Sequence, residues 1–260
     1  MAQTEILEHR RQPWMLLAMS TGYILVVGFA WWAFGAMDSV AADPAQLAQL
    51  NAQLQTFGMA SPGQTGDTSL RAMVGAVLPG YLALLVTNMP IFVAYFAGYS
   101  MIHDRESGVL PFVLLSPLSR GQMLVGKLMG LMAIPMMMHV VGTMLGCLPL
   151  MNLEIVATHQ ALVGGDISWW VLVLGVTPCF ALFIGALGTV ISALVRDVRA
   201  SMQIMSLCFW LLSLGFNMAV VYSVRPEGLG QLVGFAVASL VACIITLAVG
   251  SQVMARDLGR

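Results

Sequence analysis

Two glycines and a lysine in the segment GQMLVGKL, residues 121–128, follow the spacing of a phosphate-binding loop. In the pattern G-x-x-x-x-G-K-[ST], backbone N–H groups cradle phosphates, the lysine contacts the β- and γ-phosphates, and a Ser or Thr hydroxyl coordinates Mg²⁺. Gly121, Gly126 and Lys127 fit this pattern, but Leu128 has no hydroxyl and is followed by a long apolar run. The sequence therefore predicts no nucleotide site here. We expect Lys127 at the cytoplasmic end of a membrane span, with its ammonium group reaching the lipid headgroups.

Methionine and histidine side chains raise the question of a metal or transport site. Thioethers are soft ligands for Cu(I), and the sequence has 20 methionines, with MMMH at residues 136–139. Consecutive residues on a helix point about 100° apart, so this run cannot converge on one ion, and we expect no metal site. The spans carry no paired carboxylates and no H-E-x-x-H or G-x-S-x-G motif, so we also expect no catalytic residue, and we expect no cofactor. His139 is ionisable and deep within an apolar segment, which makes it a candidate pathway residue with Asn88. A hydrogen bond to Thr143, one turn along, is the alternative explanation for His139.

The composition indicates an integral membrane protein. Hydrophobic residues make up 59% of the chain and charged residues only 9%, whereas about a quarter of the residues in a soluble domain are charged. A formal net charge of −1 gives no support for a nucleic-acid partner.

Six apolar segments are long enough to cross a bilayer, which takes about 20 residues per helix. We therefore predict an all-α membrane protein with a single domain over residues 1–260. A short amphipathic helix is expected after Pro44 on the outer surface, and small residues at 142 and 146 and at 181 and 185 predict close helix contacts. The six predicted spans lie near residues 14–37, 73–99, 128–150, 169–195, 202–222 and 232–254.

The distribution of basic residues predicts the orientation in the membrane, because cytoplasmic loops carry an excess of Lys and Arg. Only Arg71 and Arg225 fall in the segments on the opposite side. Both termini are therefore expected in the cytoplasm, in a multi-pass protein of the cell inner (plasma) membrane. The nine basic residues that share the predicted cytoplasmic side are Arg10, Arg11, Arg105, Arg120, Lys127, Arg196, Arg199, Arg256 and Arg260.

The stretch between the second and third predicted spans, residues 103–120, has an unusual composition. A polar cluster is followed by an apolar run from Val109 to Leu115, which is too short to cross the bilayer. Pro111 is compatible with the first turn of a helix, where its missing N–H would be unpaired in any case. The sequence predicts a short apolar helix at the cytoplasmic membrane face. Such a helix must be buried against lipid, against its own bundle or against a partner protein.

This stretch resembles the signature of the permease subunits of type-2 ATP-binding-cassette (ABC) exporters, E-x-G-(T/V)-L-x-x-L-L-x-x-P-(L/V)-S-R followed by L-x-G-K. Pro111 stands where the family usually has another residue. Within the family, the stretch is most similar to permeases for nitrous-oxide reductase maturation. The matching residues include Glu106, Gly108, Leu110, Leu114, Pro117, Arg120, Gly126 and Lys127.

The resemblance implies a permease that is not itself an enzyme and that pairs as a homodimer with two cytoplasmic ABC ATPase subunits. It implies a coupling role for residues 103–120, in which Glu106 bonds to the ATPase and Gly108 allows a tight turn. The alternative for Glu106 is a solvated charge paired with Arg105 or Arg120. Membrane lipid and a periplasmic accessory protein complete the expected partners. The residues of the implied coupling site are Arg105, Glu106, Gly108, Leu110, Leu114, Pro117 and Arg120.

Two other functions fit a helical membrane protein. An ion-gradient-driven secondary transporter would need buried carboxylates or inverted repeats, and the predicted spans show neither. A membrane assembly factor without transport activity would need only the anchor that the spans provide.

Overall fold

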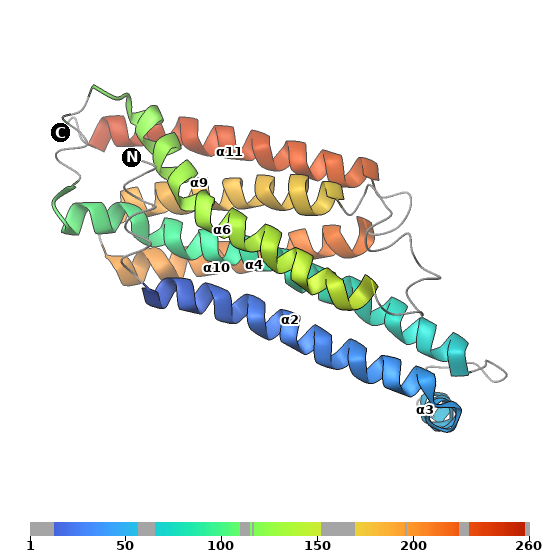
Figure 1. Ribbon diagram of the computed structural model, residues 1–260. Coiled ribbons are helices and arrows are strands. Elements are labelled where there is room, and N and C mark those ends of the chain that lie inside the picture. The colour runs from blue at the N-terminus through green and yellow to red at the C-terminus, as the bar shows by residue number, and fades with distance from the viewer. Residues whose placement is uncertain are drawn as a thin grey trace.

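A computed structural model describes residues 13–56, 66–109, 115, 117–151, 170–195, 197–223 and 229–257. Within these ranges every regular element is a helix, which confirms the predicted all-helical class (Figure 1). Helix α3 is the short helix expected after Pro44. The elements are α2 (Pro13–Ala42), α3 (Pro44–Thr56), α4 (Gly66–Glu106), α6 (Arg120–Met151), the π-helical turn η1 (Val171–Val176), α9 (Thr177–Leu194), α10 (Val198–Ser223) and α11 (Leu229–Asp257).

Five of the helices in the described ranges are long and apolar enough to cross a membrane. They coincide with the second to sixth predicted spans and make the chain a multi-pass membrane protein. The first predicted span forms the 30-residue helix α2, in which residues Ser20–Ala33 are a shorter apolar stretch. The five spans are Ala83–Glu106, Arg120–Gly146, Val171–Leu194, Val198–Met218 and Leu229–Val253.

Helix α4 lies at the centre of the bundle. It packs against α2, α3, α6, α9 and α10, and side chains on several of its faces are fully buried, among them Leu85, Met89 and Ile102. A helix that is apolar on all sides belongs in the interior of a protein or a membrane. Because α4 touches five other helices, any movement of α4 must be accommodated by most of the bundle.

Small residues allow the closest helix contacts, as their spacing predicts. A Cβ atom built on Gly142 of α6 would overlap the ring of Tyr23 on α2, and one on Gly146 would lie 2.8 Å from the Tyr81 hydroxyl on α4. On α9, a Cβ atom on Gly185 would lie 2.6 Å from Leu128 Cδ1. These glycines let helices of one subunit approach closely. Close packing then stabilises the contact, because there is no hydrophobic driving force between helices in lipid.

The outer faces of the bundle are apolar, as lipid contact requires. Large side chains point outward from three helices, including Leu25 and Trp32 on α2, Trp210 and Leu211 on α10, and Ile244 on α11. Exposed apolar surface of this extent would be a liability in a soluble protein. It is the normal surface of a membrane-embedded one.

The ends of the helices divide the molecule into two sides. The start of α2, the end of α4, the start of α6 and the end of α11 lie at one end of the bundle, and α3 lies at the other (Figure 1). We call the first of these the basic end, because it holds Arg105, Arg120 and Lys127. The predicted coupling stretch therefore lies on the same side as both ends of the described chain.

Replacing Gly142 by Ala should destabilise the bundle, because the added methyl group displaces the Tyr23 ring. Overpacking of this kind costs about 1–3 kcal/mol, so we expect a fall in Tm of about 5 °C in detergent. Gly28→Ala on α2 is the matched control, since a Cβ atom there meets nothing within 4 Å. Thermal unfolding followed by tryptophan fluorescence measures both. Equal Tm values for the two variants would contradict the close contact.

Candidate functional site

The end of α4 turns sharply at a glycine. Gly108 has φ +71°, the left-handed conformation that ends many helices. The amide of Ser107 donates to the His103 carbonyl at 2.9 Å, and the amide of Gly108 donates to the Arg105 carbonyl at 3.3 Å. The tight turn expected at Gly108 is therefore present, and it leaves Glu106 exposed at its edge.

Lys127 points into the bundle rather than toward the headgroups, so this part of the prediction was wrong. Its side chain is 4% exposed, its ammonium group pairs with the Asp104 carboxylate, and it donates a hydrogen bond to the Ser100 carbonyl at 2.9 Å. The reason is that α6 begins at Arg120. Lys127 therefore lies two turns inside the helix and beside α4. A buried charge is stable only when it is paired and hydrogen-bonded, and α4 supplies both partners.

Residues 121–128 form the first turns of α6 and not a phosphate loop. The helix starts with a capping box, in which Ser119 Oγ accepts from the Gln122 amide at 3.2 Å and Gln122 Oε1 accepts from the Ser119 amide at 2.9 Å. The amide of Met123 bonds to the Ser119 carbonyl at 3.0 Å. These N–H groups are occupied and unavailable to phosphate.

Arg105 joins the end of α4 to the end of α9. Its guanidinium donates to the Ala193 carbonyl at 3.0 Å and to the Val195 carbonyl at 3.3 Å. The last carbonyls of a helix lack intrahelical donors and carry partial negative charge, so a cation is well placed there. Arg105 is thus bound to its own bundle. Among the described side chains, neither Arg105 nor Arg120 pairs with Glu106.

Two buried serines bind the backbone of α4 one turn earlier. Ser192 of α9 accepts hydrogen bonds from the amides of Met101 and Ile102 at 3.1 and 3.2 Å. Ser201 of α10 donates to the Gly98 carbonyl at 2.6 Å. Both serines are fully buried. Ser192 adds a second tie between α4 and α9, and Ser201 ties α4 to α10.

We call this set of contacts the α4 anchor and define it as Asp104, Arg105, Lys127, Ser192 and Ser201. Sequence reasoning did not single out Asp104, Ser192 or Ser201. Asp104 could have been identified from the sequence, because an acidic residue at the end of a span needs a cation nearby. The serines carried none, because Ser is common in apolar helices and its partner atoms here belong to the backbone.

The other predicted coupling residues lie on the far side of the Gly108 turn. Pro117 is exposed, Arg120 begins α6, and Gly126 lies half-buried one residue before Lys127. The predicted short helix over residues 109–116, with Leu110 and Leu114, falls outside the described residues. The coupling role of this set stays a prediction.

The two candidate pathway residues lie on neighbouring helices. His139 is fully buried, and its Nε2 atom lies 3.2 Å from the Val173 carbonyl oxygen. Its Nδ1 atom lies 3.4 Å from the Tyr23 hydroxyl and 3.5 Å from Thr143 Oγ1. The predicted contact with Thr143 is therefore present. Tyr23 and Val173, which are distant in the sequence, also contact His139. Asn88 donates to the Leu84 carbonyl of its own helix at 3.0 Å. The transport role of both stays a prediction.

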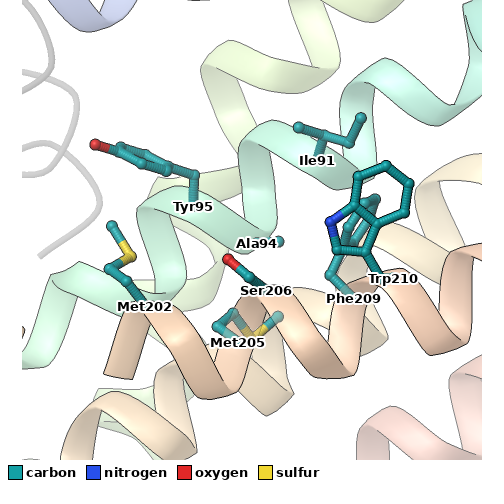
Figure 2. A pocket seen from close by; sticks show the side chains of 8 residues that line it. All are labelled: Ile91, Ala94, Tyr95, Met202, Met205, Ser206, Phe209 and Trp210. Carbon is teal, nitrogen blue, oxygen red and sulfur yellow. The ribbon is translucent and has the colours of Figure 1, made fainter. Parts of the chain in front are cut away.

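An apolar groove of about 180 Å³ lies between α4 and α10 (Figure 2). Figure 2 shows Ile91 and Tyr95 on one wall and Met202, Ser206 and Trp210 on the other. The polar groups of the lining are the Ser206 and Tyr95 hydroxyls and the indole N–H of Trp210. Within the described ranges, no three His, Cys, Asp or Glu side chains gather as metal ligands would.

Comparison with known proteins gives one family and two relatives. Residues 1–227 match the family described as ABC-2 family transporter protein. A stretch of 129 residues is 29% identical to a protein of Pseudomonas aeruginosa named "Probable ABC transporter permease protein NosY", and 130 residues are 29% identical to the protein of that name from Stutzerimonas stutzeri. Each match covers 50% of this chain and 36% of the relative, so it spans about a third of the relative's length.

Replacing Asp104 by Asn should destabilise the protein, because it removes the negative charge that faces the buried Lys127. Loss of one partner of a buried pair costs about 3–5 kcal/mol. Glu106→Gln is the control, because Glu106 is exposed. It should leave Tm unchanged. Replacing both partners, in Asp104→Leu with Lys127→Met, should recover most of the loss. An Asp104→Asn variant as stable as the control would show that the pair does not hold the two helices together.

Proposed function

Because the chain belongs to the ABC-2 family of transporter proteins as a multi-pass membrane permease, we propose that it forms the translocation path of an ABC exporter and is driven by separate ATPase subunits. The family supports a transmembrane subunit that relies on a partner for ATP hydrolysis. The helical conformation of residues 121–128 agrees with this division of labour.

The α4 anchor is the observation that carries the proposal. The segment between α4 and α6 is flanked by Asp104 before it and Lys127 after it, and these two residues form an ion pair. Arg105, next to the Gly108 turn, is bonded to the end of α9. A force that reaches the end of α4 or the start of α6 is therefore transmitted to α4, α6 and α9 together.

Glu106 is the residue best placed to receive that push. Its carboxylate is exposed beside the turn, and the two arginines expected to neutralise it are engaged elsewhere or apart from it. A charge-assisted hydrogen bond from an ATPase donor would be strong at this position. We propose that Leu110, Leu114, Pro117 and Arg120 complete the contact with the ATPase.

The permease is proposed to act as a homodimer with two ATPase subunits. The centre of the described bundle is filled, since Leu85, Met89, Ile184 and Phe216 are fully buried, and the rings of Phe180 and Phe216 stack at 4.5 Å. A path through one copy would have to displace this core. The groove between α4 and α10 lies outside it (Figure 2). We propose that two copies face each other across this groove, which widens or narrows when α4 moves.

We propose that helix α2 also crosses the membrane, as the first of six spans. The basic end is proposed to face the cytoplasm at the plasma membrane. The 30-residue length of α2 supports the first point, and the position of Arg105, Arg120 and Lys127 supports the second. A periplasmic accessory protein would then meet α3, whose Gln46, Gln49 and Gln53 are exposed at the opposite end. The 29% identity to the two NosY proteins supports a NosY-like permease. We propose a role in nitrous-oxide reductase maturation as the finer function, because the resemblance of residues 103–120 implies it.

Replacing Glu106 by Ala should uncouple the permease from its ATPase without unfolding it. Loss of one charge-assisted contact is expected to lower permease-stimulated ATP hydrolysis at least about tenfold. The measurement is ATP turnover by the reconstituted complex, with Tm of the isolated permease beside it. Ser107→Ala, an exposed change on the same turn, is the control and should keep full turnover. Unchanged turnover for Glu106→Ala would remove Glu106 from the contact.

A further inference from the structure

The π-helical turn η1 leads into α9 immediately before a proline. The amide of Thr177 donates to the Leu172 carbonyl, five residues back, and the Thr177 hydroxyl donates to the same oxygen at 2.9 Å. Pro178 follows and has no N–H group. Single π-helical turns inside α-helices are uncommon, and they mark places where the hydrogen-bond pattern changes register.

The proline leaves one carbonyl without a backbone donor in either register. In the five-residue pattern that η1 follows, the donor for the Val173 carbonyl would be residue 178, which is Pro178. In an ordinary α-helix the carbonyl without a donor would belong to Leu174, and the proline ring would press against it. The two registers therefore have similar numbers of backbone hydrogen bonds. An unpaired carbonyl is costly within a membrane, so a side-chain donor can decide between them.

His139 supplies that donor to the carbonyl freed in the π register. Its Nε2 atom lies 3.2 Å from the Val173 oxygen, which can only accept, so Nε2 carries the proton. Nδ1 then accepts from the hydroxyl of Tyr23 or Thr143, at 3.4 and 3.5 Å. The imidazole is fully buried and is held by groups from α2, α6 and η1. The position of His139 thus matches the hydrogen-bonding requirement of η1.

We propose that η1 is a two-state hinge and that His139 is the latch that holds it in the π register. When α6 moves away from α9 and the bond to Val173 opens, the α register becomes equally accessible. When the hydrogen-bond register shifts by one residue, the chain that precedes Thr177 rotates by about 100° relative to α9. Lys127, which ties α6 to α4, and His139 lie on the same helix, so movement of α4 reaches this latch through α6.

A double-mutant cycle between His139 and Pro178 tests the latch. His139→Leu removes the donor at nearly constant volume and should lower Tm by about 5 °C. Pro178→Ala restores an N–H at residue 178 that can pair with the freed carbonyl. In the Pro178→Ala background, His139→Leu should therefore lower Tm by less than half as much. Thr143→Val is the control, because it leaves the Nε2 bond to Val173 in place and should change Tm little.

Hydrogen–deuterium exchange gives a local reading of the same cycle. Amides in residues 170–177 should exchange faster in His139→Leu than in the parent protein, and this increase should vanish in the Pro178→Ala background. If His139→Leu does not accumulate, His139→Gln provides an amide donor and should keep slow exchange.

An equal loss of Tm in both backgrounds, or fast exchange in the Gln variant, would overturn the latch and assign His139 to packing. The cycle uses the permease alone. It is therefore independent of whether the proposed ATPase partner is correct.

Discussion

The ion pair between Lys127 and Asp104 is the constraint on which the rest of the structure depends. A lysine so deeply buried is tolerated only with a counter-charge and a further acceptor, and α4 offers both in Asp104 and the Ser100 carbonyl. This requirement sets the register of α6 against α4. It also holds together the two flanks of the segment that the proposed ATPase would contact.

Most interhelical polar contacts among the described residues end on backbone atoms. Arg105 bonds to the last carbonyls of α9, Ser192 and Ser201 bond to the backbone of α4, and His139 bonds to the carbonyl of Val173. Lipid offers no competing water, so backbone groups left open by a helix end or a proline need partners within the protein. Each contact fixes one helix against a defined turn of another. Apolar packing against glycines, which tolerates sliding, would not give this precision.

Much of the fold follows from the sequence, because membrane-spanning helices are set by the length of apolar runs. Five predicted spans coincide with long apolar helices, and the helix after Pro44 is present. The start of α6 required the Ser119–Gln122 capping box to be recognised. The inward direction of Lys127 could not be read locally, because its partner Asp104 lies on another helix. For the same reason Thr143 was foreseen beside His139, whereas Tyr23 and Val173, distant in sequence, were not.

We propose that this chain is the membrane subunit of a transporter whose energy comes from a separate ATPase bound at the basic end. The most direct test is purification of the tagged protein from its native membranes in mild detergent, followed by native mass measurement of the intact complex. The account predicts two copies of this chain with two copies of an ABC ATPase, and loss of the ATPase in the Glu106→Ala variant. A protein that purifies alone, or with a partner that binds no ATP, would contradict it.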